Sequence, residues 1–174
     1  MIKIVYIPHA LTSEQERGVA SGHSAVGLSG AGVQWATNAQ KVFAAMQIDA
    51  AYTSDLPRAV QTIEIALKGS KVAINSDARL REVDYGDYTG QPRDIIRGKR
   101  LDHIHIPYPH GESYDDVLAR FGDFLNELKE HHDGQTVAIC GHGIYPLEVL
   151  LNGKPIEEAL FDWVDGEYRS FTLD

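Results

Sequence analysis

Short apolar segments with the character of buried strands recur along the chain. Residues 2–8 (IKIVYIP) are almost continuously apolar, and so are residues 136–140 (TVAIC). Runs of this length and composition are typical of strands that are covered on both faces of a sheet. Three more segments are predicted strands with weaker patterns: residues 50–53, 71–75 and 169–173.

Segments with apolar residues at helical spacing lie between these strands. Ser29 and Ser113 stand where N-cap residues are expected, and Asp116 completes a capping box with Ser113. Little periodicity is present between the first strand and about residue 28. The predicted helices run from Ser29 to Met46, from Leu56 to Leu67, from Ser113 to Leu128, and over residues 144–151.

Strands that alternate with helices, several of them apolar throughout, indicate a mainly parallel sheet with helices on both faces. The predicted fold class is therefore α/β, a three-layer α/β/α sandwich with a mostly parallel central sheet. No repeat, low-complexity tract or long linker interrupts the pattern, so residues 1–174 are expected to form a single domain. Residues 79–112 are irregular, and we expect a short cap or loop excursion at about 86–112.

Composition and charge exclude several functions. The formal net charge is -9, and a field of this sign repels nucleic-acid and membrane phosphates, so neither partner is expected. A small anionic substrate responds to the local field of a pocket and is not excluded. No apolar run reaches the roughly 18 residues of a membrane span, and Pro8 interrupts the N-terminal segment too early for a signal peptide. Cys140 is the single cysteine and can form no disulfide within the chain. This fits a reducing compartment, so we expect a cytoplasmic protein.

Candidate chemistry follows the predicted strands, at the edge where active sites of parallel sheets gather. His9 and His142 each end an apolar strand, and glycines flank His142, so the backbone there can approach a ligand closely. A neutral imidazole can attack phosphorus, and a guanidinium such as that of Arg58 can hold phosphoryl oxygens. A carboxylic acid such as Glu82 can protonate a leaving oxygen. The set predicts a phosphoryl-transfer site, without metal or organic cofactor, where the two histidines meet.

A series of motifs resembles the histidine phosphatase superfamily, also called the phosphoglycerate-mutase-like family. Its Arg-His-Gly motif corresponds to 8-PHA-10, and its Ser-Ser-Asp-Leu-x-Arg-Ala-x-x-Thr motif to 53-TSDLPRAVQT-62. Its Leu-x-Glu-x-x-x-Gly-x-x-x-Gly motif is intact as 80-LREVDYGDYTG-90. Its Gly-Glu-Ser and strand-His-Gly elements are 111-GES-113 and 137-VAICGHG-143. The resemblance runs in order from residue 2 to about 151 and implies a phosphoglycerate-mutase-like fold.

The resemblance also implies a role for each matching residue. His9 would be phosphorylated during turnover, and Arg58 would bind the phosphoryl group. Glu82 would act as general acid and then as base, and His142 would stabilise the phosphoryl oxygens in the transition state, with Gly143 beside it. The implied enzyme is a histidine phosphatase, a phosphoric monoester hydrolase that acts on a small phosphorylated metabolite.

The chain departs from the family where the phosphate is bound. The arginine that precedes the family's nucleophile is Pro8 here, and the glycine that follows it is Ala10. A charge-assisted hydrogen bond contributes about 1.5–3 kcal/mol, so the loss of one guanidinium would lower the rate about tenfold to a few hundredfold. In the motif 22-GHSAVGLSGAGVQWA-36, His23 replaces the family's arginine and Ala25 its aspartate.

Two arginines are candidates to replace the missing guanidinium. Arg17 lies in the loop after His9, and Arg81 is the neighbour of Glu82. His23 is a further candidate for phosphate binding. If none of them reaches the pocket, the chain would be a catalytically degenerate member that binds a phosphorylated or other anionic ligand without turning it over.

Other functions stay open at this point. A phosphoglycerate-mutase-type phosphotransferase must keep its intermediate away from water, and residues 83–110 leave little material for the large cap that this needs, so a phosphatase is favoured. Basic residues in segment 91–110 could steer an anionic substrate. A metal-dependent hydrolase could instead use the histidines of 103-HIHIPYPH-110. No oligomeric state is predicted. The basic residues are Arg93, Arg97, Lys99 and Arg100, and the histidines are His103, His105 and His110.

Overall fold

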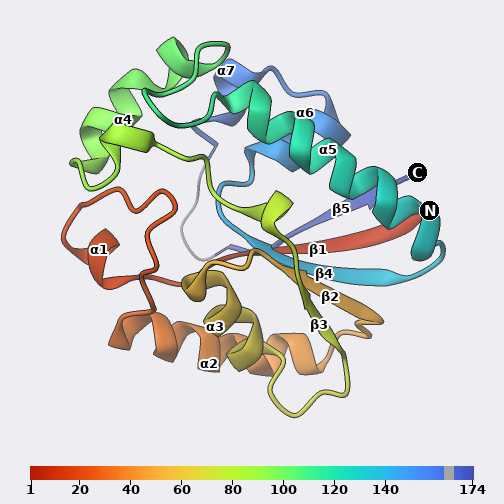
Figure 1. Ribbon diagram of the computed structural model, residues 1–174. Coiled ribbons are helices and arrows are strands. Elements are labelled where there is room, and N and C mark those ends of the chain that lie inside the picture. Colours follow the sequence, from red (N-terminus) through yellow and green to blue (C-terminus); the bar gives the residue numbers. More distant parts are fainter. Residues whose placement is uncertain (163–166) are drawn as a thin grey trace.

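In the described residues, 1–162 and 167–174, five strands form one sheet in the order β3-β2-β4-β1-β5 (Figure 1). The computed structural model pairs the first four strands in parallel and sets β5 antiparallel to β1 at the edge. The α/β class with a mostly parallel central sheet is therefore confirmed. The strands are β1 (Ile2–Pro8), β2 (Ala50–Thr53), β3 (Ile74–Ser76), β4 (Thr136–Gly141) and β5 (Arg169–Leu173).

Helices cover both faces of this sheet (Figure 1). Alternate side chains of β1 point to opposite faces, as the pleat of a strand requires. Ile4 and Tyr6 pack with α5 and α6, while Val5 and Ile7 pack with α2 and α3. The four helices are α2 (Gly30–Ala44), α3 (Pro57–Ala66), α5 (Tyr114–His131) and α6 (Tyr145–Asn152).

The central strands end at the same level of the sheet. Pro8 of β1 pairs with Gly141 of β4, so His9 and His142 directly follow the two strand ends. The N–H of His9 donates to the Gly141 carbonyl at 2.9 Å, and the N–H of Ser54, just beyond β2, also donates to β4, at 3.0 Å. Pro8 has no N–H, and the hydrogen bond to β4 at this strand end is donated by the next residue, His9.

Segment 86–112 contains more regular structure than its sequence indicates. Helix α4 (Arg93–Lys99) lies within it, above the carboxyl ends of the strands (Figure 1). Its Ile96 packs with Tyr85, Tyr108 and Tyr145 in a second apolar cluster. The other short elements are α1 (Ser13–Glu16), α7 (Ile156–Ala159) and the 3-10 turns Ala78–Leu80, Gly86–Tyr88 and Arg100–His103.

Helix caps are where the sequence predicts them. Ser29 accepts a hydrogen bond from the N–H of Gly32, and Ser113 forms a capping box with Asp116. The third strand is displaced from the predicted residues 71–75 to Ile74–Ser76. Its segment is short and polar at one end, so the sequence pattern does not fix its register. Among the described helices, none is both long and apolar enough to cross a bilayer.

Candidate active site

Two imidazole rings meet at the carboxyl edge of the sheet. The ring centroids of His9 and His142 are 5.1 Å apart, and the ring planes are tilted by 59°. The two residues come from positions far apart in the sequence and are brought together because β1 and β4 are adjacent and end together. This is the convergence that the strand pattern predicts.

The His9 ring is held in one tautomer. Its Nδ1 lies 2.9 Å from the carbonyl oxygen of Ala10, and a carbonyl can only accept, so Nδ1 carries the proton and Nε2 carries the lone pair. Burial lowers the pKa of His9 to about 3, with further lowering by the positive charges of Arg58 and Arg93. At neutral pH the ring is therefore uncharged, as a nucleophile must be.

The His142 ring lies against Ser54. Its Nε2 is 3.0 Å from the hydroxyl oxygen of Ser54, and the residue is 3% exposed. Burial, together with the charge of Arg58, lowers the pKa of His142 well below its ordinary value. Its Nδ1 is buried and has no partner among the described residues. Such a buried nitrogen without a partner is unusual in a folded protein.

The two glycines around His142 are explained by close contacts. A Cβ on Gly141 would overlap the hydroxyl of Tyr6, and a Cβ on Gly143 would lie 2.9 Å from the ring of Tyr145. The Tyr6 hydroxyl in turn donates to the Gly143 carbonyl at 3.1 Å. The glycines therefore allow the strand end to be packed tightly from both sides.

Arg58 is a buried cation with no carboxylate partner among the described residues. It projects from the first turn of α3 and is 2% exposed. Its Nη1 donates to the Ser24 carbonyl at 3.1 Å, and its Nη2 donates to the Gly22 carbonyl at 2.7 Å. These bonds fix the guanidinium without neutralising it, so its charge remains available to an anion.

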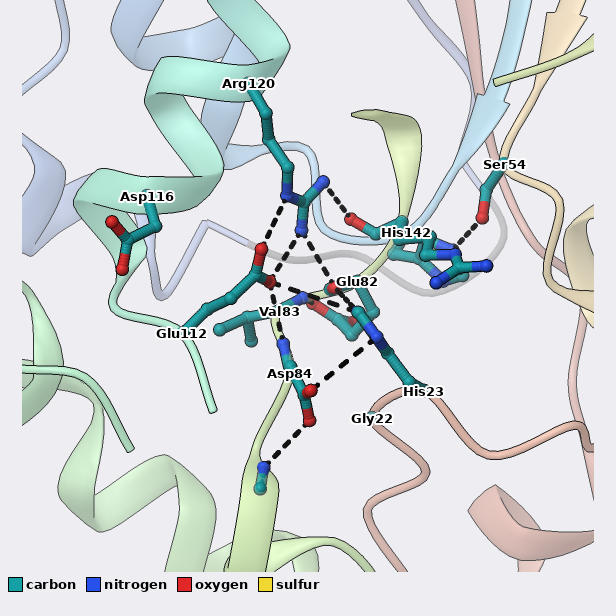
Figure 2. Close-up of polar contacts among 12 residues, drawn as sticks. Gly22, His23, Ser54, Glu82, Val83, Asp84, Glu112, Asp116, Arg120 and His142 are labelled. Carbon is teal, nitrogen blue, oxygen red and sulfur yellow. Dashed lines mark hydrogen bonds and ion pairs between the residues drawn. The ribbon is translucent and has the colours of Figure 1, made fainter. Parts of the chain in front are cut away.

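Glu82 is held through its backbone. Its carbonyl oxygen accepts hydrogen bonds from His23 Nε2 at 2.7 Å and from Arg120 Nη2 at 2.9 Å, as Figure 2 shows. Its side-chain Oε1 accepts from the N–H of Val83 at 3.0 Å. The structure thus places His23 behind the Glu82 backbone, beside Asp84, and not in the lining of the cavity described below.

Arg120 and Glu112 support this loop; Glu112 belongs to the Gly-Glu-Ser motif, whereas Arg120 lies in no motif of the sequence. The guanidinium of Arg120 donates to both carboxylate oxygens of Glu112, each at 3.0 Å (Figure 2). It also donates to the carbonyls of Arg79 and Arg81, at 2.6 and 2.8 Å. The Oε2 atom of Glu112 also accepts a hydrogen bond from the N–H of Asp84 at 3.0 Å. In the sequence, the only indication of this contact is that Glu112, just before the start of α5, and Arg120, within α5, carry opposite charges.

A cavity of about 620 Å³ opens beside these groups, and His142 is not among the residues that line it. His9, Arg58, Glu82 and Gly143 line it, together with arginines of the cap segment. Neither proposed substitute for the missing guanidinium does so. Arg81 donates to both carboxylate oxygens of Asp55, at 2.7 and 2.6 Å, and Arg17 is exposed. The cap arginines in the lining are Arg93, Arg97 and Arg100.

The three histidines of the cap point to different partners. His103 stacks on Tyr108 with ring centroids 3.8 Å apart. His105 bonds to Asp115, and His110 to Asp87. In the part of the chain that the structure describes, no group of three or more His, Cys, Asp or Glu side chains is arranged to hold a metal ion. The geometry therefore gives no support to a metal-dependent hydrolase built on these histidines.

The chain is similar to curated proteins along most of its length. The chain is 32% identical over 154 residues to phosphoglycerate mutase-like protein 4 of Arabidopsis thaliana, covering 81% of this chain and 66% of the plant protein. It is 35% identical over 171 residues to a 2,3-bisphosphoglycerate-dependent phosphoglycerate mutase of Streptococcus thermophilus, covering 95% of this chain and 72% of the mutase. The chain thus spans about two thirds of the first relative and somewhat more of the second.

Solved structures share the fold. YhfR of Bacillus stearothermophilus superimposes with a TM-score of 0.87 at 27% identity, over 100% of this chain and 92% of that one. A mycobacterial glucosyl-3-phosphoglycerate phosphatase in complex with VO3 gives 0.85 at 26% identity, over 97% and 91% of the two chains. Residues 4–155 match the profile of the histidine phosphatase superfamily (branch 1). With the two facing imidazoles at its centre, the chain belongs to the histidine phosphatase superfamily.

Proposed function

We propose that this protein is a phosphatase that hydrolyses a small phosphorylated metabolite through a phosphohistidine on His9. The single observation that carries the proposal is the state of the His9 ring. Nδ1 donates to the Ala10 carbonyl and the pKa is lowered to about 3, so an uncharged ring with its lone pair on Nε2 lines the cavity. Arg58 lies beside it as a cation without a carboxylate partner among the described residues.

In the first step, Nε2 of His9 attacks the phosphorus of a bound phosphomonoester. A bond from nitrogen to phosphorus forms, the bond from phosphorus to the ester oxygen breaks, and Glu82 in its acid form gives its proton to that oxygen. The ring becomes a cation while it carries the phosphoryl group, and the Ala10 carbonyl stabilises its Nδ1–H. Arg58 would hold the phosphoryl oxygens, and His142, whose ring centroid lies 5.1 Å from that of His9, would help to stabilise their charge.

In the second step, Glu82, now a carboxylate, removes a proton from a water molecule. The water oxygen attacks phosphorus, the bond from nitrogen to phosphorus breaks, and His9 returns to its uncharged state. The products are the alcohol and inorganic phosphate. No step requires a metal or an organic cofactor.

A phosphotransferase of the mutase type is the second candidate, and the 35% identity to the streptococcal mutase favours it. The short cap favours the phosphatase. A mutase must shield its phosphorylated intermediate from water, and only residues 83–110, between Glu82 and the Gly-Glu-Ser motif, are available to do so. The likeness to the glucosyl-3-phosphoglycerate phosphatase, over 91% of that chain, supports the same choice. A cytoplasmic location is part of the proposal, since Cys140 is buried as a free thiol.

The test replaces the nucleophile. His9→Gln is expected to lower phosphate release from an aryl phosphate by about 10³-fold or more, with EDTA present throughout. Wild-type enzyme mixed with ³²P-labelled substrate and quenched in base should carry acid-labile label that the variant lacks. His131→Gln, an exposed histidine of α5, is the matched control and should behave as wild type.

Three results would decide against this proposal. Equal activity of His9→Gln and wild type would exclude a phosphohistidine on this residue. Binding of phosphate without any release from a panel of phosphomonoesters would favour a degenerate family member. Transfer of the label to a phosphoglycerate acceptor in preference to water would favour the mutase.

A further inference from the structure

The end of β1 leaves a gap in the set of phosphate-binding cations. Pro8 is buried and pairs with Gly141, and its side chain has no charge to offer a phosphoryl group. The Arg-His-Gly motif of the superfamily has an arginine at this position. If the site is active, another cation must balance the charge there.

Eight of the nine arginines fall into two groups by what their guanidinium groups contact, and Arg17 belongs to neither. Outside the cavity, four of them form ion pairs with carboxylates of the described residues. Those that line the cavity form none with the described residues, so their charge is available to a ligand. The paired group is Arg79, Arg81, Arg120 and Arg169, and the cavity group is Arg58, Arg93, Arg97 and Arg100.

Within the cavity group, Arg97 and Arg100 contact Phe161, which also lines the cavity. Both guanidinium groups lie over the ring of Phe161, at 6.0 and 5.7 Å from its centroid. Arg100 also donates to the carbonyl of Leu160. Arg93 has no such contact among the described residues, so its side chain is the most available cation of the cap.

The backbone of Arg93 is fixed at the rim of the cavity. Its N–H donates to the Gly18 carbonyl at 2.8 Å, and the preceding residue, Pro92, forms a β-bridge with Val19. The same loop continues to Gly22, whose carbonyl holds Arg58. One short segment, residues 18–22, therefore accepts a hydrogen bond from the Arg93 backbone at one end and from the Arg58 guanidinium at the other. All five residues of this segment line the cavity.

Electrostatics agree with this geometry. The charge of Arg93 contributes to the low pKa of His9, after burial and the charge of Arg58. Arg93 and His9 both line this cavity.

We propose that Arg93, delivered from the cap, supplies the phosphate-binding guanidinium that the chain lacks at Pro8. The inference rests on the proposed phosphatase function, and it makes Arg93 a catalytic residue that contacts the phosphoryl group. It also means that phosphate binding in this protein depends on the position of α4, and not on the strand end alone.

The test compares Arg93→Ala with Arg17→Ala, an exposed arginine that does not line the cavity. With an aryl phosphate as substrate, kcat/KM of Arg93→Ala should fall about tenfold to a few hundredfold, and millimolar methylguanidinium should restore part of it. Arg17→Ala should keep wild-type activity and show no response to methylguanidinium. A second variant, Pro8→Arg combined with Arg93→Ala, should recover activity that Arg93→Ala alone lacks.

Equal kcat/KM in wild type and Arg93→Ala would overturn the inference and leave the phosphatase proposal intact. A loss that methylguanidinium does not restore, accompanied by a lowered melting temperature, would assign Arg93 a structural role and also overturn it. If wild-type protein releases no phosphate, the phosphatase proposal fails, and orthovanadate binding measured by calorimetry decides the inference separately. Arg93→Ala should then bind orthovanadate at least about tenfold more weakly than Arg17→Ala, and equal binding would overturn the role of Arg93.

Discussion

The state of the His9 ring is set by the residue that follows it. The Ala10 carbonyl accepts from Nδ1, while the Ala10 N–H donates to the hydroxyl of Thr62 at 2.9 Å. Thr62 donates in turn to the backbone carbonyl of Arg58 at 2.7 Å. One chain of hydrogen bonds therefore orients the His9 ring, the proposed nucleophile, and connects it to the helix that carries Arg58. The geometry is fixed before a substrate arrives, which lowers the reorganisation needed for reaction.

The proposed role of Glu82 gives a prediction that depends on the leaving group. Glu82→Gln keeps the size of the side chain but removes the carboxyl proton. The first-turnover burst with an alkyl phosphate should slow by about 10²–10⁴-fold, because a poor leaving oxygen needs that proton. The burst with a nitrophenyl phosphate should slow far less, since that oxygen leaves readily as an anion. Rapid-quench kinetics measure both.

Glu130→Gln, an exposed residue of α5, is the control for this experiment and should leave both bursts unchanged. An equal slowing of the two substrates by Glu82→Gln would show that the carboxyl group does not protonate the leaving oxygen.

At the scale of elements, the loop that carries Glu82 is packed against the loop that leads into α5. The N–H of Glu112 donates to the Asp84 carbonyl at 2.9 Å, and the N–H of Asp87 donates to the Pro109 carbonyl at 3.0 Å. A Cβ on Gly111 would overlap the Asp84 carbonyl oxygen. The glycine of the Gly-Glu-Ser motif is therefore required for close backbone approach.

Replacing Gly111 tests this packing. Gly111→Ala should lower the free energy of unfolding by about 2 kcal/mol or more, because the backbone of residue 84 must move to admit a methyl group. Gly122→Ala is the matched control, since this glycine lies within α5 and its added Cβ would meet no atom within 4 Å. It should raise the free energy of unfolding by about 0.5–1 kcal/mol. Urea denaturation measures both, and effects of the same sign would refute the argument.

At the scale of the whole molecule, positive and negative charge are separated. The chain has a net charge of -9, yet four arginines without ion pairs to described residues line its cavity. These arginines outnumber the carboxylates of the lining, which are Glu82, Asp94 and Asp162, so the local field favours an anion although the distant field does not. Burial, and after it the charge of Arg58, lowers the pKa of both His9 and His142.

Those low pKa values make folding stability depend on pH. Below the ordinary histidine pKa of about 6.5, His9 and His142 bind protons in the unfolded chain but stay uncharged in the folded protein. Stability should therefore fall as the pH drops below about 6.5, by at most about 1.4 kcal/mol per pH unit for each ring. For His9 this loss continues until about pH 3, its folded pKa.

His142→Gln removes one of these contributions and keeps a group that can bond to Ser54. Between pH 7 and pH 5 the free energy of unfolding of wild type should fall more than that of His142→Gln, by up to about 2 kcal/mol. Urea denaturation at the two pH values gives the comparison. Parallel losses in the two proteins would mean that His142 is not held uncharged in the fold.

Local patterns in the sequence determined the strands, most helices and the meeting of His9 with His142. Apolar runs define the strands, caps define the helix starts, and the carboxyl ends of parallel strands share one edge, so residues at those ends converge whatever the packing details. Arg58 follows from the same logic, because it lies in the first turn after β2.

Tertiary structure decided which other charges reach the cavity. Arg81 is next to Glu82 in the sequence, but neighbouring residues of an extended chain point to opposite sides, and Arg81 pairs with Asp55. His23 supports the Glu82 backbone, and Arg93 reaches the cavity from a helix inside a segment without apolar periodicity. Such placements depend on contacts between irregular segments distant in sequence, and no local pattern in the chain encodes them.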